Sequence, residues 1–272
     1  MGRPMSIKIG FIGAGRMAGA MIKGLIAKNV YSPEEIVACA PTEETRNRMT
    51  QETGIRMFGK ASDIAGLTDV LVLAVKPKHI AGLFTEEGLE LRDGQMLISI
   101  AAGVKIATLK TYAPDAKVVR VMPNHCCMVL EGAAGYVMDE TCTGEDRSIV
   151  KTVLSAIGLA EEVRECDLDA VTGICGSSPA FLYMAAQALI EAGKKYGLTE
   201  EQSTALAAQS MVGAGKMILE SGMTTEQLID GVCSPGGTTI EGVKVLRDEH
   251  FEDVMIHCVD ATVKRSVEMG KE

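Results

Sequence analysis

Residues 9–18 read Ile-Gly-Phe-Ile-Gly-Ala-Gly-Arg-Met-Ala, and this stretch ends an apolar strand and begins a helix. Gly13, Gly15 and Ala18 have the G-x-G-x-x-G/A spacing, in which the first glycine permits a tight turn. Gly15 has no side chain, so a pyrophosphate can approach the N–H groups at the positive end of the helix dipole. Ala18 lets the helix pack closely on the strand. The stretch predicts a dinucleotide site, and a purely structural glycine turn is the alternative.

Short apolar runs recur up to about residue 164 and alternate with segments of helical spacing, which is typical of a parallel sheet covered on both faces. The run at 70–75 is uniformly apolar, as expected of a strand buried on both faces. The predicted strands are residues 7–12, 36–40, 70–75, 96–100, 118–122, 134–138 and 159–163.

Past Asp167 the apolar residues recur at spacings of three and four, which predicts helices. These helices are expected at residues 168–196, 199–221, 224–231, 238–249 and 251–269. We therefore predict an α/β protein with a Rossmann-type doubly wound sheet in residues 1–164 and an all-helical dimerisation domain in residues 165–272. Residues 203–218 are rich in Ala, Gly and Ser, so this helix should be covered on nearly all sides, most easily in a subunit interface.

Composition excludes several classes of protein. The formal net charge of −9 disfavours nucleic acid and anionic membranes as partners. The 8 cysteines show no C-x-x-C pair, which indicates reduced thiols in a cytosolic protein and predicts no metal site. No run of about eighteen apolar residues suggests a membrane span. The first six residues fit a loose acylation pattern that many unrelated sequences share.

Ligands of a doubly wound sheet bind at the carboxyl ends of its strands. The candidate cofactor-binding residues share that position after a predicted strand, and they are Ile12, Gly13, Ala14, Gly15, Arg16, Met17, Ala74, Val75, Lys76, Pro77, Ala101, Ala102 and Asn124. For Lys76 and Pro77 the plain alternatives are a solvated lysine and a proline that begins a helix.

The tip of the second strand bears on the choice of cofactor. It reads Ala40-Pro41-Thr42 and lacks the acidic residue that usually accepts the ribose hydroxyls of NAD. A carboxylate there would repel a 2′-phosphate, so its absence, with Arg46 or Lys60 in reach, favours NADPH, with NADH as the alternative.

A second group of small and hydroxyl residues, 234–242, reads Ser-Pro-Gly-Gly-Thr-Thr-Ile-Glu-Gly at the start of a predicted helix. The N–H groups of Gly237, Thr238 and Thr239 would form a cradle for a small anion such as a carboxylate. Ordinary capping by Ser or Thr is the alternative. A similar segment, residues 173–180, is explained equally well by close helix packing.

Five motifs occur in order: Phe-Ile-Gly-Ala-Gly-x-Met-Ala (11–18), Ala-Val-Lys-Pro (74–77), Met-Pro-Asn (122–124), Gly-Ser-x-Pro-Ala (176–180) and Pro-Gly-Gly-Thr-Thr (235–239). Together they resemble pyrroline-5-carboxylate reductase over nearly the whole chain. The resemblance implies reduction of L-1-pyrroline-5-carboxylate to L-proline with NADPH or NADH, the last step of proline biosynthesis. It also implies a homodimer that often builds larger rings.

The resemblance further implies roles for single residues. Backbone N–H groups in the cradle of Gly237, Thr238 and Thr239, with the hydroxyl of Ser234, would hold the substrate carboxylate. Thr239 would face the ring nitrogen as the catalytic residue. A hydroxyl is a poor acid at neutral pH, so we expect Thr239 to orient the substrate while the proton arrives with it.

Two other classes of function compete with this hypothesis. A β-hydroxyacid or 6-phosphogluconate type dehydrogenase shares the plan but needs a lysine on the first interdomain helix. This chain has Ser177 and Ser178 there and no lysine before Lys194. A nucleotide-binding scaffold could share the fold but would not need the anion cradle.

Overall fold

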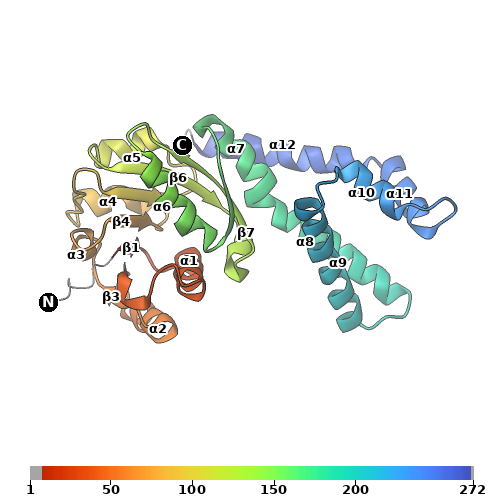
Figure 1. Cartoon of the computed structure of the whole chain (residues 1–272), viewed down its shortest axis with the longest axis horizontal. Coiled ribbons are helices and arrows are strands. Elements are labelled where there is room, and N and C mark those ends of the chain that lie inside the picture. Colours follow the sequence, from red (N-terminus) through yellow and green to blue (C-terminus); the bar gives the residue numbers. More distant parts are fainter. Residues whose placement is uncertain (1–7, 271–272) are drawn as a thin grey trace. The chain divides into compact units, whose positions relative to one another are not determined.

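The computed structural model describes residues 8–270, so Ile7 and the acylation pattern of residues 1–6 lie outside the described residues. The N-terminal part contains an eight-stranded sheet with the order β3-β2-β1-β4-β5-β6-β7-β8 (Figure 1). Strands β1 to β6 run parallel in the order of a doubly wound dinucleotide-binding sheet, which confirms the predicted fold. The strands are β1 (Ile9–Ile12), β2 (Ile36–Cys39), β3 (Arg56–Phe58), β4 (Val70–Leu73), β5 (Met96–Ser99), β6 (Lys117–Pro123), β7 (Gly132–Met138) and β8 (Gly158–Glu162).

Helices cover both faces of the sheet because its central strands are apolar on both sides. Val70 and Val72 of β4 enter one hydrophobic core, whereas Leu71 and Leu73 enter the other, as the two-residue period of a strand requires. The first core is completed by α1 (Arg16–Ala27), α2 (Glu43–Thr53) and α6 (Gly144–Ser155), and the second by α3 (Ser62–Ala65), α4 (Ile80–Thr85) and α5 (Ile106–Tyr112).

The prediction of a parallel sheet is wrong for the last two strands. β7 runs antiparallel to β6, and β8 is parallel to β7. Only the short 3₁₀ turn His125–Val129 separates β6 from β7, and it cannot provide the long crossover that a parallel neighbour needs. β3 was not predicted, because three edge residues that begin with an arginine are too few to show a strand period.

A buried carboxylate joins the antiparallel pair at the end of β7. Asp139 accepts the N–H of Val118 at 2.8 Å, and the Nζ atom of Lys110 lies 2.8 Å from the same oxygen. Burial alone would raise the pKa of Asp139, but hydrogen bonds from Lys110, Thr141 and Val118 outweigh it and lower the pKa to about 2. The carboxylate is therefore ionised and paired at neutral pH.

Packing divides the chain into two units, residues 1–177 with 262–272 and residues 178–261. These limits differ from the expected boundary between residues 164 and 165. That boundary is expected where the strand-like runs end. The difference arises because Leu168 and Val171 of α7 (Leu168–Val171) pack against Val137 of β7. The first helical residues after the sheet thus belong to the sheet unit.

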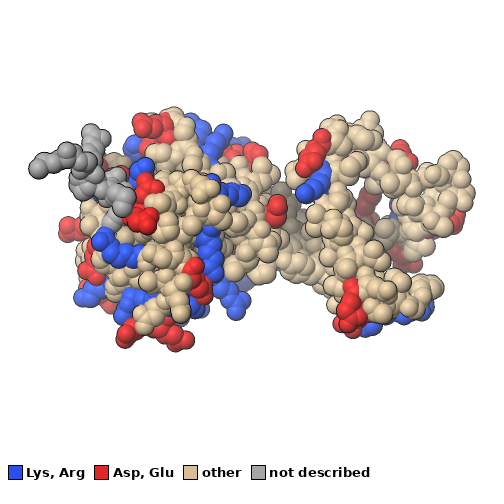
Figure 2. Space-filling model, turned by 60° about the horizontal axis from the view of Figure 1, so that its bottom comes forward, with Lys and Arg blue, Asp and Glu red and all other residues tan. Residues whose placement is uncertain are grey.

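The second unit contains the predicted helices α8 (Ser178–Lys195), α9 (Glu200–Glu220), α10 (Thr225–Val232), α11 (Thr238–Asp248) and the first part of α12 (Phe251–Met269). Within it, the only residues described as buried are Pro179, Ser203 and Ala207. Leu206 and Leu219 of α9 are 60% and 73% exposed. The surface of these helices in Figure 2 carries few charges. A single chain therefore leaves most of α9 exposed, with only Ser203 and Ala207 buried on it among the described residues. An exposed apolar surface of this kind is typical of an interface.

The helix that follows the sheet includes the small-residue segment noted in the sequence. Residues Thr172–Ser177 form a π-helix, so the segment is not a turn. A Cβ on Gly176 would lie 2.7 Å from the Cε of Met122, which favours the close-packing interpretation. By length and composition alone, the stretch Glu165–Lys195 qualifies as a membrane span among the described residues, although the sequence analysis did not predict one.

Candidate active site

The predicted cofactor residues lie along one edge of the sheet. They follow β1, β4, β5 and β6, which are neighbours in the sheet and parallel, so their carboxyl ends form a row. The strand order reverses between β1 and β4, and ligands of doubly wound sheets bind at such a point. Topology thus brings together segments separated by more than a hundred residues.

Gly13 fits the tight turn that the sequence assigns to it. Its φ is +99°, and a Cβ at this position would lie 2.8 Å from the carbonyl oxygen of Ala74. Both the backbone conformation and the close approach of β1 to the end of β4 therefore require glycine.

Gly15 is required for a different reason. It precedes α1 as the N-cap residue, no side chain caps the helix, and the first turn holds no acidic residue. Apart from Gly15 and its two chain neighbours, no atom of the described residues lies within 4 Å of the position that a Cβ on Gly15 would take. Open space in front of unpaired helix N–H groups fits a pyrophosphate. Ala18 is buried against the sheet, as the third position of the fingerprint predicts.

A cavity of about 480 Å³ lies between the tip of β2 and the loop after β4. Ile12, Gly13 and Val75 line it, which places three of the predicted cofactor residues together. Burial raises the pKa of Cys39, another lining residue, to about 11, so its thiol is neutral. The cavity follows the tip of the second strand, where a doubly wound sheet binds the adenosine half of a dinucleotide.

Arg46 is held beside this tip by the backbone. Its Nη1 atom donates to the carbonyl oxygens of Ala40 and Pro41, each at 2.8 Å. The guanidinium is therefore held at the tip of β2, and any contact with a 2′-phosphate stays a prediction. For Lys60, the structure shows only a backbone hydrogen bond to Asp63.

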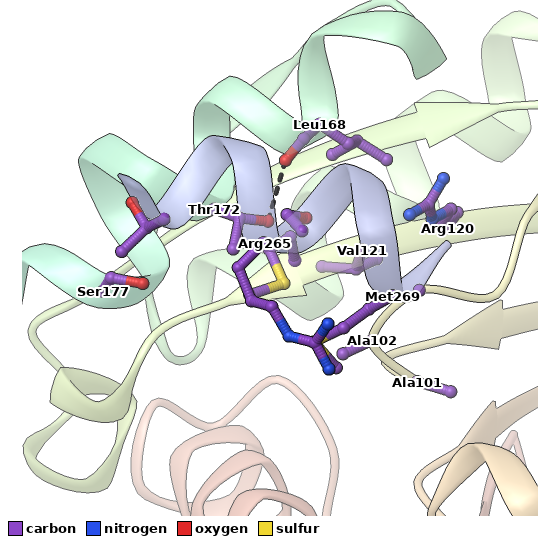
Figure 3. A pocket seen from close by; sticks show the side chains of 13 residues that line it. Ala101, Ala102, Arg120, Val121, Leu168, Thr172, Ser177, Arg265 and Met269 are labelled. Atoms are coloured by element: carbon purple, nitrogen blue, oxygen red, sulfur yellow. Dashed lines mark hydrogen bonds between the residues drawn. The ribbon is translucent and has the colours of Figure 1, made fainter. Parts of the chain in front are cut away.

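A second cavity of about 200 Å³ lies at the ends of β5 and β6, and Figure 3 shows the side chains that line it. Two predicted cofactor residues, Ala101 and Ala102, line it, and Arg265 reaches toward it from α12 (Figure 3). The ionisable side chains among its described lining residues are those of Arg120 and Arg265, and guanidinium groups are in general poor proton donors. This cavity therefore contains no side chain suited to donate a proton.

The remaining predicted cofactor residues, apart from Asn124, differ in how exposed they are. Gly15 and Arg16 line a third cavity, of about 270 Å³. Ala14 is buried, Met17 and Ala74 are partly buried, and Lys76 and Pro77 are exposed at the start of a 3₁₀ turn.

Asn124 has a structural task. It is 8% exposed, and its Oδ1 atom accepts the N–H groups of Cys126 and Ala133 at 3.1 Å. These bonds fix the loop after β6, so any contact of Asn124 with the cofactor stays a prediction.

The predicted anion cradle lies in the helical unit, at the start of α11. Pro235 and Gly236 form a turn closed by a 2.9 Å bond from the N–H of Gly237 to the carbonyl oxygen of Ser234. Gly236 has φ +73°, as the third position of a type II turn requires. The Gly237 N–H is therefore occupied, which corrects its predicted place in the cradle.

Thr238 and Thr239 are exposed and begin the helix, so their N–H groups have no acceptor within α11. No side chain caps this helix. The alternative of ordinary capping by a hydroxyl is thus not met, and the two N–H groups remain directed at solvent with the positive end of the dipole.

Sequence reasoning missed the polar residues that line the second cavity. Arg120 lies inside the apolar run of β6, where it reads as an interruption of a strand. Arg265 and Ser266 lie near the end of the last helix, about 140 residues away along the chain, and no local pattern links them to the sheet.

Comparison with known proteins identifies the family. Residues 165–269 match the family model described as pyrroline-5-carboxylate reductase dimerisation, and residues 8–103 match that described as NADP oxidoreductase coenzyme F420-dependent. Pyrroline-5-carboxylate reductase 2 of Bacillus subtilis (strain 168) is 38% identical over 97% of this chain and 96% of its own length. The chain belongs to the pyrroline-5-carboxylate reductase family.

Solved structures of the pyrroline-5-carboxylate reductase family agree with this assignment. The enzyme of Coxiella burnetii is 31% identical, with a TM-score of 0.91 and coverage of 97% of this chain and 98% of its own. The Plasmodium falciparum pyrroline carboxylate reductase, solved with NADP bound, is 30% identical, with a TM-score of 0.84 and coverage of 98% and 99%. The resemblance inferred from five motifs is therefore confirmed over nearly the whole chain.

Proposed function

We propose that this protein reduces L-1-pyrroline-5-carboxylate to L-proline with NADPH, the last step of proline biosynthesis, and that it uses NADH less efficiently. The observation that carries the proposal is the uncapped start of α11 after the Pro-Gly-Gly turn. Two unpaired N–H groups and a helix dipole suit a single small carboxylate. A scaffold that only bound a nucleotide would have no use for this second anion site.

NADPH supplies the hydride when it is bound, and the chain supplies the binding surface. Gly13 and Gly15 leave the backbone at the start of α1 accessible to the pyrophosphate. Arg46, held beside the tip of β2, would bind the 2′-phosphate, and the small side chains of Ala101 and Ala102 form an apolar wall of the cavity at the end of β5. Small side chains at that wall allow the substrate ring and the nicotinamide to lie face to face, which is the orientation that hydride transfer needs.

At the substrate, the N–H groups of Thr238 and Thr239 bind the carboxylate, together with the hydroxyl of Ser234. The hydroxyl of Thr239 orients the ring nitrogen. A hydroxyl is a poor acid at neutral pH, and the ionisable side chains that line the second cavity are the guanidinium groups of Arg120 and Arg265, which are also poor acids in general. The substrate therefore enters as the protonated imine, whose carbon is already electrophilic.

The working form is proposed to be a homodimer that assembles into a larger ring. The exposed apolar surface of α9 supports the dimer, and so does the match of residues 165–269 to a dimerisation family model. A second copy would also cover the apolar stretch Glu165–Lys195, so we propose a partner subunit there and not a membrane. The 8 free cysteines and the net charge of −9 suit a cytosolic protein without nucleic acid as a partner.

The rival reaction, oxidation of an alcohol by a β-hydroxyacid type dehydrogenase, needs a base on the first helix after the sheet. Lys194 is paired with Glu191 and Glu200 near the end of α8. Ser177 and Thr172 line the cavity instead, and a hydroxyl is no base at neutral pH. The absence of a lysine at the start of this helix disfavours that chemistry.

The test is consumption of NADPH, and separately of NADH, by the purified protein with L-1-pyrroline-5-carboxylate, followed at the nicotinamide absorbance. We expect L-proline as the product and a higher kcat/KM with NADPH. Failure to oxidise either cofactor would refute the reductase proposal. A clearly higher kcat/KM with NADH would refute the proposed cofactor preference alone.

A further inference from the structure

We propose that Glu165 is a positioning residue that holds the loop between β5 and α5 in the conformation that binds the nicotinamide half of the cofactor. The loop contains Ala101 and Ala102, which line the cavity at the ends of β5 and β6. The inference deepens the proposed function, on which it rests. It concerns a side chain at the start of the 3₁₀ turn Glu165–Asp167, and no motif in the sequence points to it.

The first observation is that α5 does not cap itself. Lys105 is its N-cap residue, makes no side-chain capping bond, and is followed by a first turn without an acidic residue. The missing acceptor comes from 59 positions further along the chain, because the Oε1 atom of Glu165 accepts the N–H of Ile106 at 2.8 Å. A carboxylate here satisfies a free N–H group and lies at the positive end of the helix dipole.

The second observation is that the same oxygen is fixed from another side. The Nη1 atom of Arg120 on β6 lies 3.2 Å from the Oε1 of Glu165, and the Arg120 side chain is only 12% exposed. Arg120 also lines the cavity (Figure 3). A largely buried guanidinium is costly to leave without a carboxylate partner, so the ion pair with Arg120 holds Glu165 against β6.

The loop is therefore fastened at both ends. At its beginning, the Oγ atom of the fully buried Ser99 accepts the N–H of Ala101 at 3.3 Å. At its end, Glu165 binds the N–H of Ile106. Between them Gly103 turns the chain with φ +78°. Loss of the second attachment would leave a short loop that must be ordered each time the cofactor binds.

This arrangement predicts a specific kinetic signature. A loop that is disordered before binding weakens affinity, whereas the bound complex, once ordered, still transfers hydride. Replacement of Glu165 should therefore raise the Kd and the KM for NADPH while kcat and the KM for the imine substrate change little. General destabilisation would instead lower the fraction of active protein and reduce kcat without a selective effect on the cofactor.

The experiment compares Glu165→Ala with the matched control Asp167→Ala. Asp167 lies in the same 3₁₀ turn, and its carboxylate binds the guanidinium of the exposed Arg164 at 2.7 Å. Asp167→Ala therefore removes the same charge and an ion pair from this turn without touching the bond to Ile106. NADPH binding is measured by the fluorescence of the nicotinamide, which suits a chain with 0 tryptophans. Steady-state kinetics then give kcat and both KM values.

We expect Glu165→Ala to raise the Kd for NADPH about tenfold, equivalent to about 1.4 kcal/mol, and Asp167→Ala to change it less than about twofold. Glu165→Gln keeps an oxygen for Ile106 and should recover part of the affinity. Equal Kd values for Glu165→Ala and Asp167→Ala would overturn the inference. Wild-type protein that binds NADPH but does not reduce the imine would instead refute the proposed function, and the comparison of Kd values would still stand.

A second variant removes the donor of the same hydrogen bond, so that the inference can still be tested if Glu165→Ala fails to fold. Ile106→Pro removes the N–H donor at the first helical position, where the backbone tolerates proline, and Ile106→Ala is its control because the Ile106 side chain packs against two of the cores. Lys105 already has the extended backbone, φ −79° and ψ 156°, that a residue before proline adopts. Ile106→Pro should raise the Kd for NADPH as Glu165→Ala does, and an unchanged Kd would also overturn the inference.

Discussion

The two glycines of the cofactor turn give the sharpest test of the structure, because they are required for different reasons. Gly13 has φ +99° and leaves a Cβ only 2.8 Å from the carbonyl oxygen of Ala74. Gly15 has φ −75° and open space beyond it. We therefore expect Gly13→Ala to destabilise the fold and Gly15→Ala to impair cofactor binding with little effect on the fold.

The magnitudes follow from these geometries. A left-handed conformation costs an alanine about 1–2 kcal/mol, and the close contact with the rigid backbone of β4 adds to it, so Gly13→Ala should cost about 2–3 kcal/mol of unfolding free energy. For Gly15→Ala, the poorer N-cap and the lower entropy of the unfolded chain oppose each other, so stability should change by less than about 1 kcal/mol. Its methyl group occupies the approach of the pyrophosphate, and the Kd for NADPH should rise at least about tenfold.

Urea unfolding at a single protein concentration measures the first effect, since an oligomer's stability depends on concentration. Titration of NADPH fluorescence measures the second. A Gly15→Ala protein that binds NADPH like the wild type would refute the assignment of the helix start as the pyrophosphate site. A Gly13→Ala protein of unchanged stability would show that the backbone there relaxes into a conformation that alanine accepts.

Four further predictions address other parts of the molecule. Thr239→Ala should lower kcat about tenfold at an unchanged Kd for NADPH, and an unchanged kcat in steady-state kinetics would remove Thr239 from the mechanism. Arg46→Ala should raise the KM for NADPH about tenfold and leave that for NADH unaltered. Folding lowers the pKa of the paired Asp139 from 3.8 to about 2, which contributes about 2 kcal/mol to the free energy of unfolding above pH 4. This contribution is lost as the pH falls toward 2. In urea unfolding, the free energy of unfolding of Asp139→Asn should therefore decrease less than that of the wild type over this pH range. Leu206→Glu, on the exposed face of α9, should shift the dimer toward the monomer in light scattering.

Most of the sheet could be predicted because its central strands are buried on both faces. Residues 70–75 are a continuous apolar run and residues 96–100 are interrupted only by Ser99, and such runs identify strands whatever their neighbours are. The edge strand Arg56–Phe58 has no such burial, so its sequence carries no comparable signal. The antiparallel β7 was also unpredictable from its own residues, since strand direction depends on the connection and not on the strand.

The residues of the candidate site likewise include some that the sequence could predict and some that it could not. Positions that depend on backbone geometry, such as Gly13 and Gly236, are visible in the sequence because only glycine adopts their conformations freely. Glu165 and Arg120 act through contacts between segments 45 residues apart, and neither belongs to a motif. The engaged N–H of Gly237 shows a further limit, since a motif gives the residues of a turn but not which N–H group closes it.

The two units of the chain therefore differ in what stabilises them, and this difference bears on function. The sheet unit has two cores and rigid strand ends, which can hold a cofactor turn in a single conformation. The helical unit has scarcely a buried side chain among its described residues and exposes leucines of α9. Helices without a core gain their stability from burial against another chain. If the start of α11 binds the substrate carboxylate, the geometry of that site depends on the proposed dimer, and assembly is then a condition for substrate binding. The glycine turn that binds the cofactor needs only the sheet unit.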